Sequence, residues 1–104
     1  MSTTRVDPLA DNEPTNSRSY RIGDVARYVG VSTHALRAWE RRYGTVEPQR
    51  TPGGSRLYDA AQIDRLKTLK DLTDYGHSIG EVARLSLAEL KRLLAATLEL
   101  AGSK

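Results

Sequence analysis

Residues 22–44, "IGDVARYVGVSTHALRAWERRYG", contain the strongest structural signal in the sequence. The first apolar residues repeat at i, i+3, i+4 and i+7, the spacing of a short amphipathic helix: Ile22, Val25, Ala26 and Val29. Gly30 is a typical helix stop, and Ser32 is a favourable N-cap for a second helix, which Gly44 ends. Two helices joined by Gly-Val-Ser, the second of them rich in arginine, predict a helix-turn-helix.

The second helix has two different faces. At 100° per residue its large apolar side chains gather on one side, which is predicted to face the core: Leu36, Trp39 and Tyr43, with Ala35 beside them. For Trp39 we favour core packing over base stacking. The opposite face carries no acidic residue and consists of His34, Arg37, Ala38 and Arg41. Ala38 would let the backbone approach a flat partner closely, so this face is typical of a recognition helix in the major groove of DNA. Glu40 lies near the border, where it can pair with nearby arginines, and Arg42 lies on the other flank.

A basic hairpin is predicted to come next, at "RTPGGSRLY" (residues 50–58). The Pro-Gly-Gly turn would join two short antiparallel strands, roughly Glu47 to Arg50 and Ser55 to Tyr58, with positive φ expected at Gly54. Taken alone, this stretch could be a solvated surface turn. After a recognition helix it is typical of a wing, with Arg50 and Arg56 splayed from the turn toward a DNA backbone or a minor groove. Tyr58 is expected to divide its ring and hydroxyl between core and phosphate.

The positive charge of the chain is concentrated around these elements. The whole chain of 104 residues carries +3, whereas residues 18–58 alone hold eight arginines and three acidic residues. Arginine offers planar donors suited to phosphate oxygens and guanine edges, so the pattern favours nucleic acid as partner over a membrane surface.

The rest of the chain divides into a tail and further helices. Residues 1–17 read as a disordered N-terminal tail, residues 18–90 as the DNA-binding domain, and residues 91–104 as the end of a C-terminal helix and a linker. Capping pairs predict two further helices: Asp59 with Gln62 for a helix over about residues 60–75, and Ser86 with Glu89 for one over about residues 87–100. Between them Ser78 begins a helix of one to two turns, in which "IGEVAR" (79–84) repeats "IGDVAR" (22–27). We expect similar packing for the two copies.

Residues 20 to about 90 resemble the MerR-type winged helix-turn-helix DNA-binding domain. The resemblance is carried by "YRIGDVARYVGVSTHALRAWERRYG", by "RTPGGSRLY" and by the subsequent Leu- and Lys-rich helix. "LRAWERRYG" with "RTPGGSRLY" is particularly similar to the CarA, CarH and LitR light-responsive repressors, in which a cobalamin-binding region comes after the DNA-binding domain. The sequence departs from the family's pattern at Ser55, where a larger residue is common, and at "YGTVEP" (43–48), which replaces an aromatic-proline pair.

The resemblance implies a mainly α, winged helix-turn-helix fold with a two-stranded hairpin wing and additional C-terminal helices. The residues expected at the DNA are those of the recognition helix (Thr33, His34, Arg37, Ala38, Arg41, Arg42), of the wing (Arg50, Gly53, Gly54, Ser55, Arg56, Tyr58) and of the backbone contacts (Tyr20, Ser32).

The function expected is that of a cytoplasmic, sequence-specific transcription regulator of the repressor type. Its partner would be an operator or promoter with repeated half-sites, with self-association through further C-terminal sequence. Two alternatives stay open: an excisionase-like architectural factor, and an antirepressor-like module that binds an acidic protein. The sequence lacks an Asp-x-His-x-x-Gly cobalamin motif, cysteines and paired carboxylates, so we expect no cofactor, no metal site and no enzyme activity in this chain. Cobalamin would belong only to a further, C-terminal domain.

Overall fold

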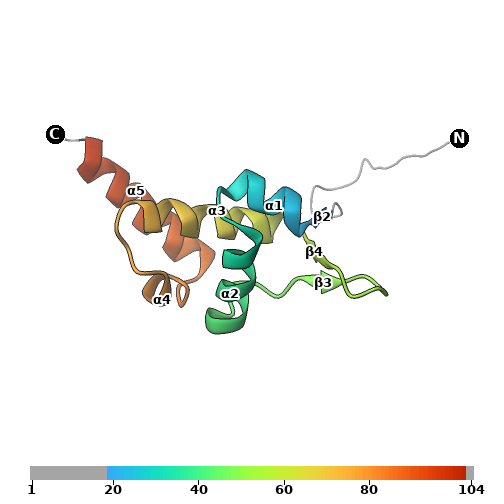
Figure 1. Ribbon diagram of the computed structural model, residues 1–104. Helices are drawn as coiled ribbons and strands as arrows, with labels where there is room; N and C mark the ends of the chain where they lie inside the picture. The colour runs from blue at the N-terminus through green and yellow to red at the C-terminus, as the bar shows by residue number, and fades with distance from the viewer. Residues whose placement is uncertain (1–18, 103–104) are drawn as a thin grey trace, which may run out of the picture.

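The computed structural model describes residues 19–102, so the predicted tail at 1–17 lies outside the described part. Its elements are β2 (Tyr20–Arg21), α1 (Ile22–Val29), α2 (Thr33–Tyr43), β3 (Gln49–Arg50), β4 (Arg56–Tyr58), α3 (Ala60–Asp74), α4 (Ile79–Val82) and α5 (Leu87–Gly102). In Figure 1 the hairpin of β3 and β4 projects from one end of the molecule, and α5 lies at the opposite end. The predicted fold class is confirmed.

The helix boundaries depend on local capping chemistry. The Ser32 hydroxyl accepts a hydrogen bond from the Ala35 amide at 3.0 Å, and Gly44 closes α2 in the left-handed conformation, with φ +60°. Asp59 and Gln62 form both hydrogen bonds of a capping box at the start of α3. Each of these interactions spans four residues or fewer, which is why the sequence predicts them.

The sheet differs from the prediction in two ways. It has a third strand, β2, and its order is β2-β4-β3, with Tyr20 opposite Tyr58 and Arg50 opposite Arg56. β3 is also shorter than predicted, because Glu47 and Pro48 do not pair with β4: the Glu47 carbonyl accepts from the Gln62 side chain, and proline has no N–H to donate.

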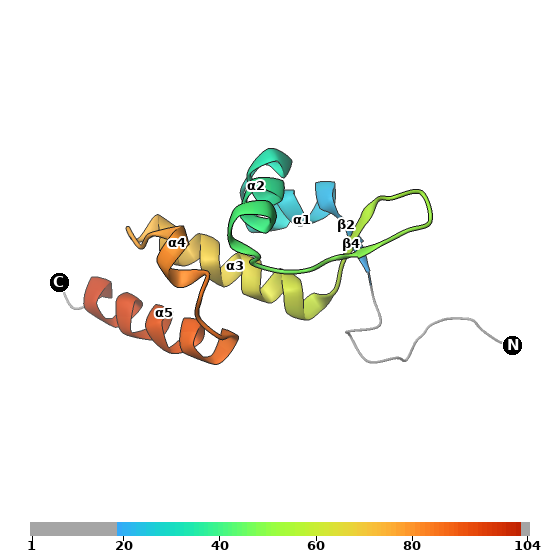
Figure 2. The ribbon, with the colours of Figure 1, turned by 90° about the horizontal axis from the view of Figure 1, so that it is seen from below.

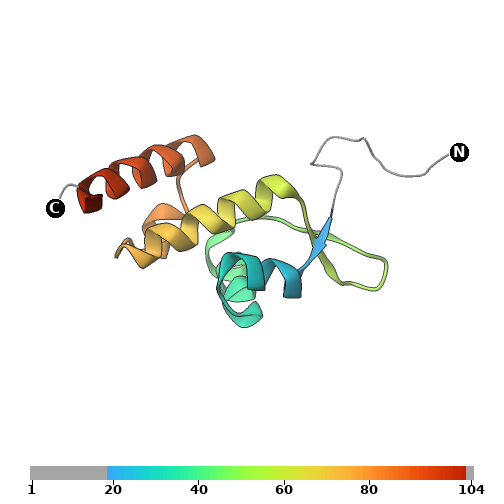
Figure 3. The same cartoon turned by 90° about the horizontal axis from the view of Figure 1, so that it is seen from above.

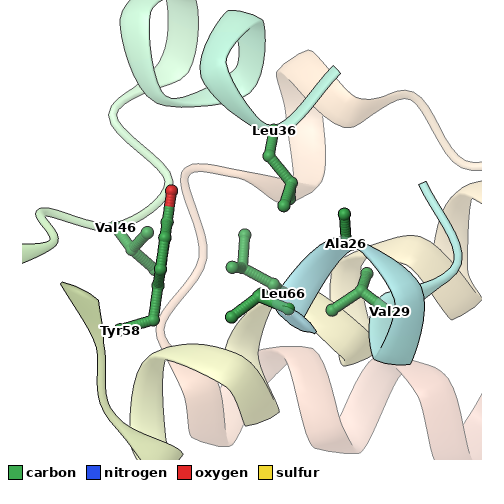
Figure 4. Close-up of a cluster of buried hydrophobic side chains, with 7 residues drawn as sticks. Ala26, Val29, Leu36, Val46, Tyr58 and Leu66 are labelled. Atoms are coloured by element: carbon green, nitrogen blue, oxygen red, sulfur yellow. The ribbon is translucent and has the colours of Figure 1, made fainter. Parts of the chain in front are cut away.

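Two clusters of buried side chains form the core. The N-terminal cluster joins α1, α2, β4 and the first half of α3, as Figure 4 shows: Val25, Ala26, Val29, Leu36, Val46, Tyr58 and Leu66. The C-terminal cluster joins the second half of α3 to α4 and α5: Leu69, Leu72, Val82 and Leu90. Trp39 packs against both clusters, which confirms its predicted place in the core. Figure 3 shows α3 running between the two groups of elements that these clusters hold together.

The predicted core face of α2 is confirmed at Leu36 and corrected at Tyr43. Leu36 is buried, whereas Tyr43 is 38% exposed. The Tyr43 ring lies against α4, where a Cβ built on Gly80 would sit 3.5 Å from it. Tyr43 is the last residue of α2, beyond the end of the core, so helical spacing alone overstates its burial.

Candidate nucleic-acid interface

The outward face of α2 carries arginines that have no acidic partner among residues 19–102. His34, Arg37 and Arg41 are exposed, and the half-buried Ala38 lies between them. Arg37, Arg41 and Arg42 make no ion pair with any residue in the described range 19–102. On α3, by contrast, Lys67 and Lys70 are each paired with an aspartate one turn along the helix. The uncompensated charge is therefore directed outward from α2.

A shallow groove of about 540 Å³ adjoins this face. It lies between the start of α1, the side of α2 and the hairpin, and its lining consists of Arg21, Ile22, Gly23, Asp24, Arg27, Arg37, Gly54, Ser55 and Arg56. Four of these residues are arginines, and the single acid, Asp24, is paired with Arg27. Such a groove is suited to an anionic ligand, in particular a phosphate backbone.

Sequence reasoning did not place Arg21 and Arg27 at the site. Neither residue belongs to the second helix or the hairpin, and only the tertiary fold brings the start of α1 beside the wing, as Figure 2 shows. The available signal was the count of eight arginines in residues 18–58, which includes both.

The tip of the hairpin has the expected backbone conformation. Gly54 has φ +90°, as predicted, and Gly53 has no positive φ. The Thr51 hydroxyl accepts a hydrogen bond from the Ser55 amide at 3.1 Å, and the Thr51 amide donates to the Ser55 carbonyl at 2.9 Å. Gly53, Gly54 and Ser55 are all exposed, so the tip presents mainly backbone to a partner.

The two wing arginines are drawn together rather than splayed, which corrects the sequence-based expectation. Arg56 Nε donates to Glu40 Oε1 at 2.8 Å, and Arg50 Nη2 lies 3.9 Å from Glu40 Oε2. Arg50 also donates from Nη1 to the Gly54 carbonyl at 3.1 Å. A carboxylate on α2 thus attracts a cation from each strand of the hairpin.

Tyr58 lies deeper than predicted. Its side chain enters the N-terminal cluster from β4 (Figure 4), and the whole residue is only 1% exposed. The hydroxyl is buried and has no hydrogen-bond partner among the described residues, so it does not reach a surface where a phosphate could bind. Burial raises the pKa of Tyr58, and the nearby Glu40 carboxylate raises it further.

The remaining predicted residues lie beside the outward face of α2 or in a different part of the molecule. Ser32 and Thr33 stand at the start of α2, on either side of its N-terminal boundary. Tyr20 is half-buried and lines a different, more apolar groove between α1 and α3, together with Tyr28 and Ile63. Of the predicted α2 residues, the structure places Arg37 in one groove with Gly54, Ser55 and Arg56 of the wing. It places Tyr20 in a different groove.

Within residues 19–102, no cluster of three or more potential metal ligands is found. The helices of the same range are too short or too polar to span a bilayer.

Comparison with known proteins supports one family. Residues 20–89 match the model of the MerR HTH family regulatory proteins. Over 68 residues the chain is 50% identical to the HTH-type transcriptional repressor CarH of Myxococcus xanthus, a match that covers 65% of this chain and 23% of CarH. It is 46% identical over 66 residues to the HTH-type transcriptional regulator MlrA of Escherichia coli K12, covering 64% of this chain and 27% of MlrA. The matched region spans about a quarter of these curated relatives.

Solved structures share the fold. A MerR-family transcriptional regulator from Bacillus cereus superimposes with a TM-score of 0.59 at 22% identity, over 81% of this chain and 67% of that one. HiNmlR, a MerR-family regulator that lacks the sensor domain and was crystallised with promoter DNA, gives 0.52 at 22% identity, over 78% of this chain and 55% of that one.

Proposed function

We propose that this chain, which belongs to the MerR family of helix-turn-helix regulatory proteins, binds specific sites on double-stranded DNA through the outward face of α2 and the hairpin. Its family and fold are those of DNA-binding transcription regulators. The single observation that carries the proposal is the arginine face of α2, which makes no ion pair within the described residues and lies beside a groove lined by four arginines.

The geometry suits a major groove, which is about 12 Å wide and admits one α-helix. Arg37 and Arg41 are one turn apart and can donate two parallel hydrogen bonds to a guanine edge or a phosphate. Ala38 between them is small enough for close approach, and its methyl group suits a thymine methyl. His34, Thr33, Ser32 and Arg42 flank this centre, where backbone phosphates would lie.

The hairpin and the arginine groove would track the DNA backbone or an adjacent minor groove. Arg21 and Arg27 join the wing in this role, whereas the buried Tyr58 does not. We further propose that the chain acts in the cytoplasm as a repressor, as the name of CarH indicates for that relative, and that it occupies repeated half-sites.

A salt titration with two DNA probes tests the proposal. One probe is a duplex selected from a random library with the wild-type chain, and the other is an unselected random duplex of the same length. We expect both to bind with affinity that falls steeply with salt, and the selected duplex to bind about 1,000-fold more tightly or better. Arg41→Ala should weaken binding of the selected duplex by about 1–3 kcal/mol and change the random duplex less.

Arg92→Ala is the matched control, because Arg92 is an exposed arginine on α5 at the far end of the molecule. It should leave both affinities within about twofold of the wild type. If Arg41→Ala lowered the affinity for both duplexes equally, Arg41 would contact a phosphate and not a base edge. Failure of the wild-type chain to bind any duplex in a salt-dependent way would overturn the proposed function.

A further inference from the structure

We propose that Glu40 is a positioning residue for DNA recognition, which sets the place of the wing relative to α2 by holding Arg56 and Arg50. The proposal rests on the proposed function. It concerns an acidic residue, whereas DNA attracts basic ones.

The contacts of Glu40 connect two elements that are separate in sequence. Its two carboxylate oxygens lie 2.8 Å from Arg56 Nε and 3.9 Å from Arg50 Nη2. Arg50 and Arg56 are direct partners in the β3–β4 pairing, so one carboxylate engages both strands of the hairpin at the same level. The bond to Arg56 crosses 16 positions of sequence.

This ion pair is more than a solvated surface contact. The side chains of Glu40 and Arg56 are only 19% and 21% exposed, whereas Arg50 is 51% exposed. Partly desolvated, hydrogen-bonded pairs hold their geometry better than exposed pairs, which water and salt weaken. The hairpin needs such support, because β3 has two residues and β4 three, too few to fix an orientation by themselves.

An acid at this place opposes DNA binding in one respect and supports it in another. Its charge offsets a cation beside the phosphates, which lowers affinity for any DNA. Its geometry holds the wing in place before DNA arrives, which lowers the entropic cost of binding a site that must fit α2 and the wing together. Random DNA makes no such demand. Neutralising Glu40 should therefore weaken binding of the selected DNA without weakening binding of random DNA.

Glu40→Gln tests this with the same selected and random duplexes. The substitution keeps the shape of the side chain and removes its charge. We expect the selected duplex to bind about tenfold more weakly, while the random duplex binds equally well or more tightly. Glu47→Gln is the matched control: Glu47 is exposed, lies just before β3 and makes no side-chain ion pair within the described residues, so its loss should not weaken binding of either duplex.

Arg56→Lys is the second variant and keeps the charge of the wing. A lysine lacks the Nε–H that bonds Glu40, so this variant should weaken the selected duplex as Glu40→Gln does, and the double variant should be no weaker than either single one. The proposal would be overturned if Glu40→Gln bound both duplexes more tightly and Arg56→Lys bound them as the wild type does. Glu40 would then act only as an unfavourable charge.

A measurement without DNA separates this proposal from the proposed function. In ¹⁵N NMR spectra the Arg56 Nε–H should exchange slowly in the wild type and rapidly in Glu40→Gln, with circular dichroism unchanged. Rapid exchange in the wild type would contradict a held wing even if DNA binds. Slow exchange in a wild-type chain that binds no DNA would show that Glu40 holds the wing. It would refute the proposed DNA-binding function and, with it, the role of Glu40 in DNA recognition.

Discussion

The arginines of this chain differ in what surrounds their guanidinium groups. Arg41 on α2 is exposed and makes no ion pair among the described residues, so its donors are available to a partner. Arg56 is half-buried against Glu40, so its donors are largely engaged within the protein. Arg65 is half-buried and donates to three backbone carbonyls. One residue type is therefore exposed, ion-paired or bonded to backbone carbonyls, and the neighbours of each arginine decide which.

The buried hydroxyl of Tyr58 gives a prediction at the scale of one atom. Tyr58→Phe removes a polar group that has no partner among the described residues, so the free energy of unfolding should stay unchanged or rise by up to about 1 kcal/mol. Affinity for the selected duplex should not change. Urea denaturation and DNA titration check the two parts. A loss of DNA affinity would instead support the phosphate contact of the Tyr58 hydroxyl that the sequence predicted.

The raised pKa of Tyr58 gives a second prediction, for alkaline pH. In the unfolded chain a tyrosine ionises near a pH of about 10, whereas in the folded chain the same group stays neutral to higher pH. As the pH rises, ionisation of this tyrosine therefore stabilises the unfolded state before the folded one. The free energy of unfolding is unaffected by this group below a pH of about 10 and falls as the pH rises above that value. The unfolding free energy of the wild type should fall relative to that of Tyr58→Phe over this range. Parallel curves for the two proteins, in urea titrations over roughly pH 9 to 11, would contradict the prediction.

At the scale of elements, similar sequences give similar packing in helices of different length. "IGDVAR" forms most of α1, which has eight residues, and "IGEVAR" contains α4, which has four. In both copies the Val-Ala pair is buried: Val25 and Ala26 in the N-terminal cluster, and Val82 and Ala83 on the C-terminal side. The expectation of similar packing is confirmed, although the two helices end at different distances from the shared motif.

The wing turn gives a prediction at the element scale. Gly54→Val should weaken binding of the selected duplex without removing charge, because φ is +90° at this position and a β-branched residue there costs about 1–3 kcal/mol of strain. Gly53→Ala is the control: its φ is not positive, and the added Cβ would meet only the Thr51 hydroxyl at 3.9 Å. DNA titration and circular dichroism should show reduced binding and an intact helical fold for Gly54→Val alone. Binding of the selected duplex by Gly54→Val as tight as by the wild type would mean that the shape of the tip does not matter.

At the scale of the whole molecule, Arg65 joins the two halves. Its three donors reach the carbonyls of Thr45, Leu85 and Ala83 at 2.6 to 2.7 Å, from the segment after α2 and the segment after α4. Burial lowers the pKa of the Arg65 guanidinium, although it stays charged at any pH that the fold tolerates.

Arg65→Met should lower the free energy of unfolding by about 2–4 kcal/mol, because it leaves three carbonyls without their donor. Arg84→Met, an exposed arginine on the segment after α4, should change it by less than about 0.5 kcal/mol. Urea denaturation compares the two variants. Equal and small effects would show that water replaces the Arg65 donors without loss.

The oligomeric state is also a property of the whole molecule. On α5, Leu90 is fully buried and Leu93 and Leu94 pack against the C-terminal cluster, so the inward side of this helix is already covered by α3 and α4. Leu98 is 46% exposed, but a stable interface needs about 800 Å² per partner. We expect the 104-residue chain to be mainly monomeric at micromolar concentration in sedimentation equilibrium. A stable dimer there would mean that the outer side of α5 supplies an interface.

The helices, their caps, the turn at Gly54 and the outward face of α2 were all predictable from the amino-acid sequence. These features depend on hydrogen bonds and spacings within about four residues, which are readable along the chain. Four features depend on contacts between distant elements: the third strand, the burial of the Tyr58 hydroxyl, the partners of Glu40 and Arg65, and the place of Arg21 and Arg27 beside the wing. The bonds that Glu40 and Arg65 make cross 16 to 20 positions of sequence. An arginine can donate its hydrogen bonds to DNA, to a carboxylate or to a carbonyl. The packing of distant elements determines which of these acceptors lies within reach.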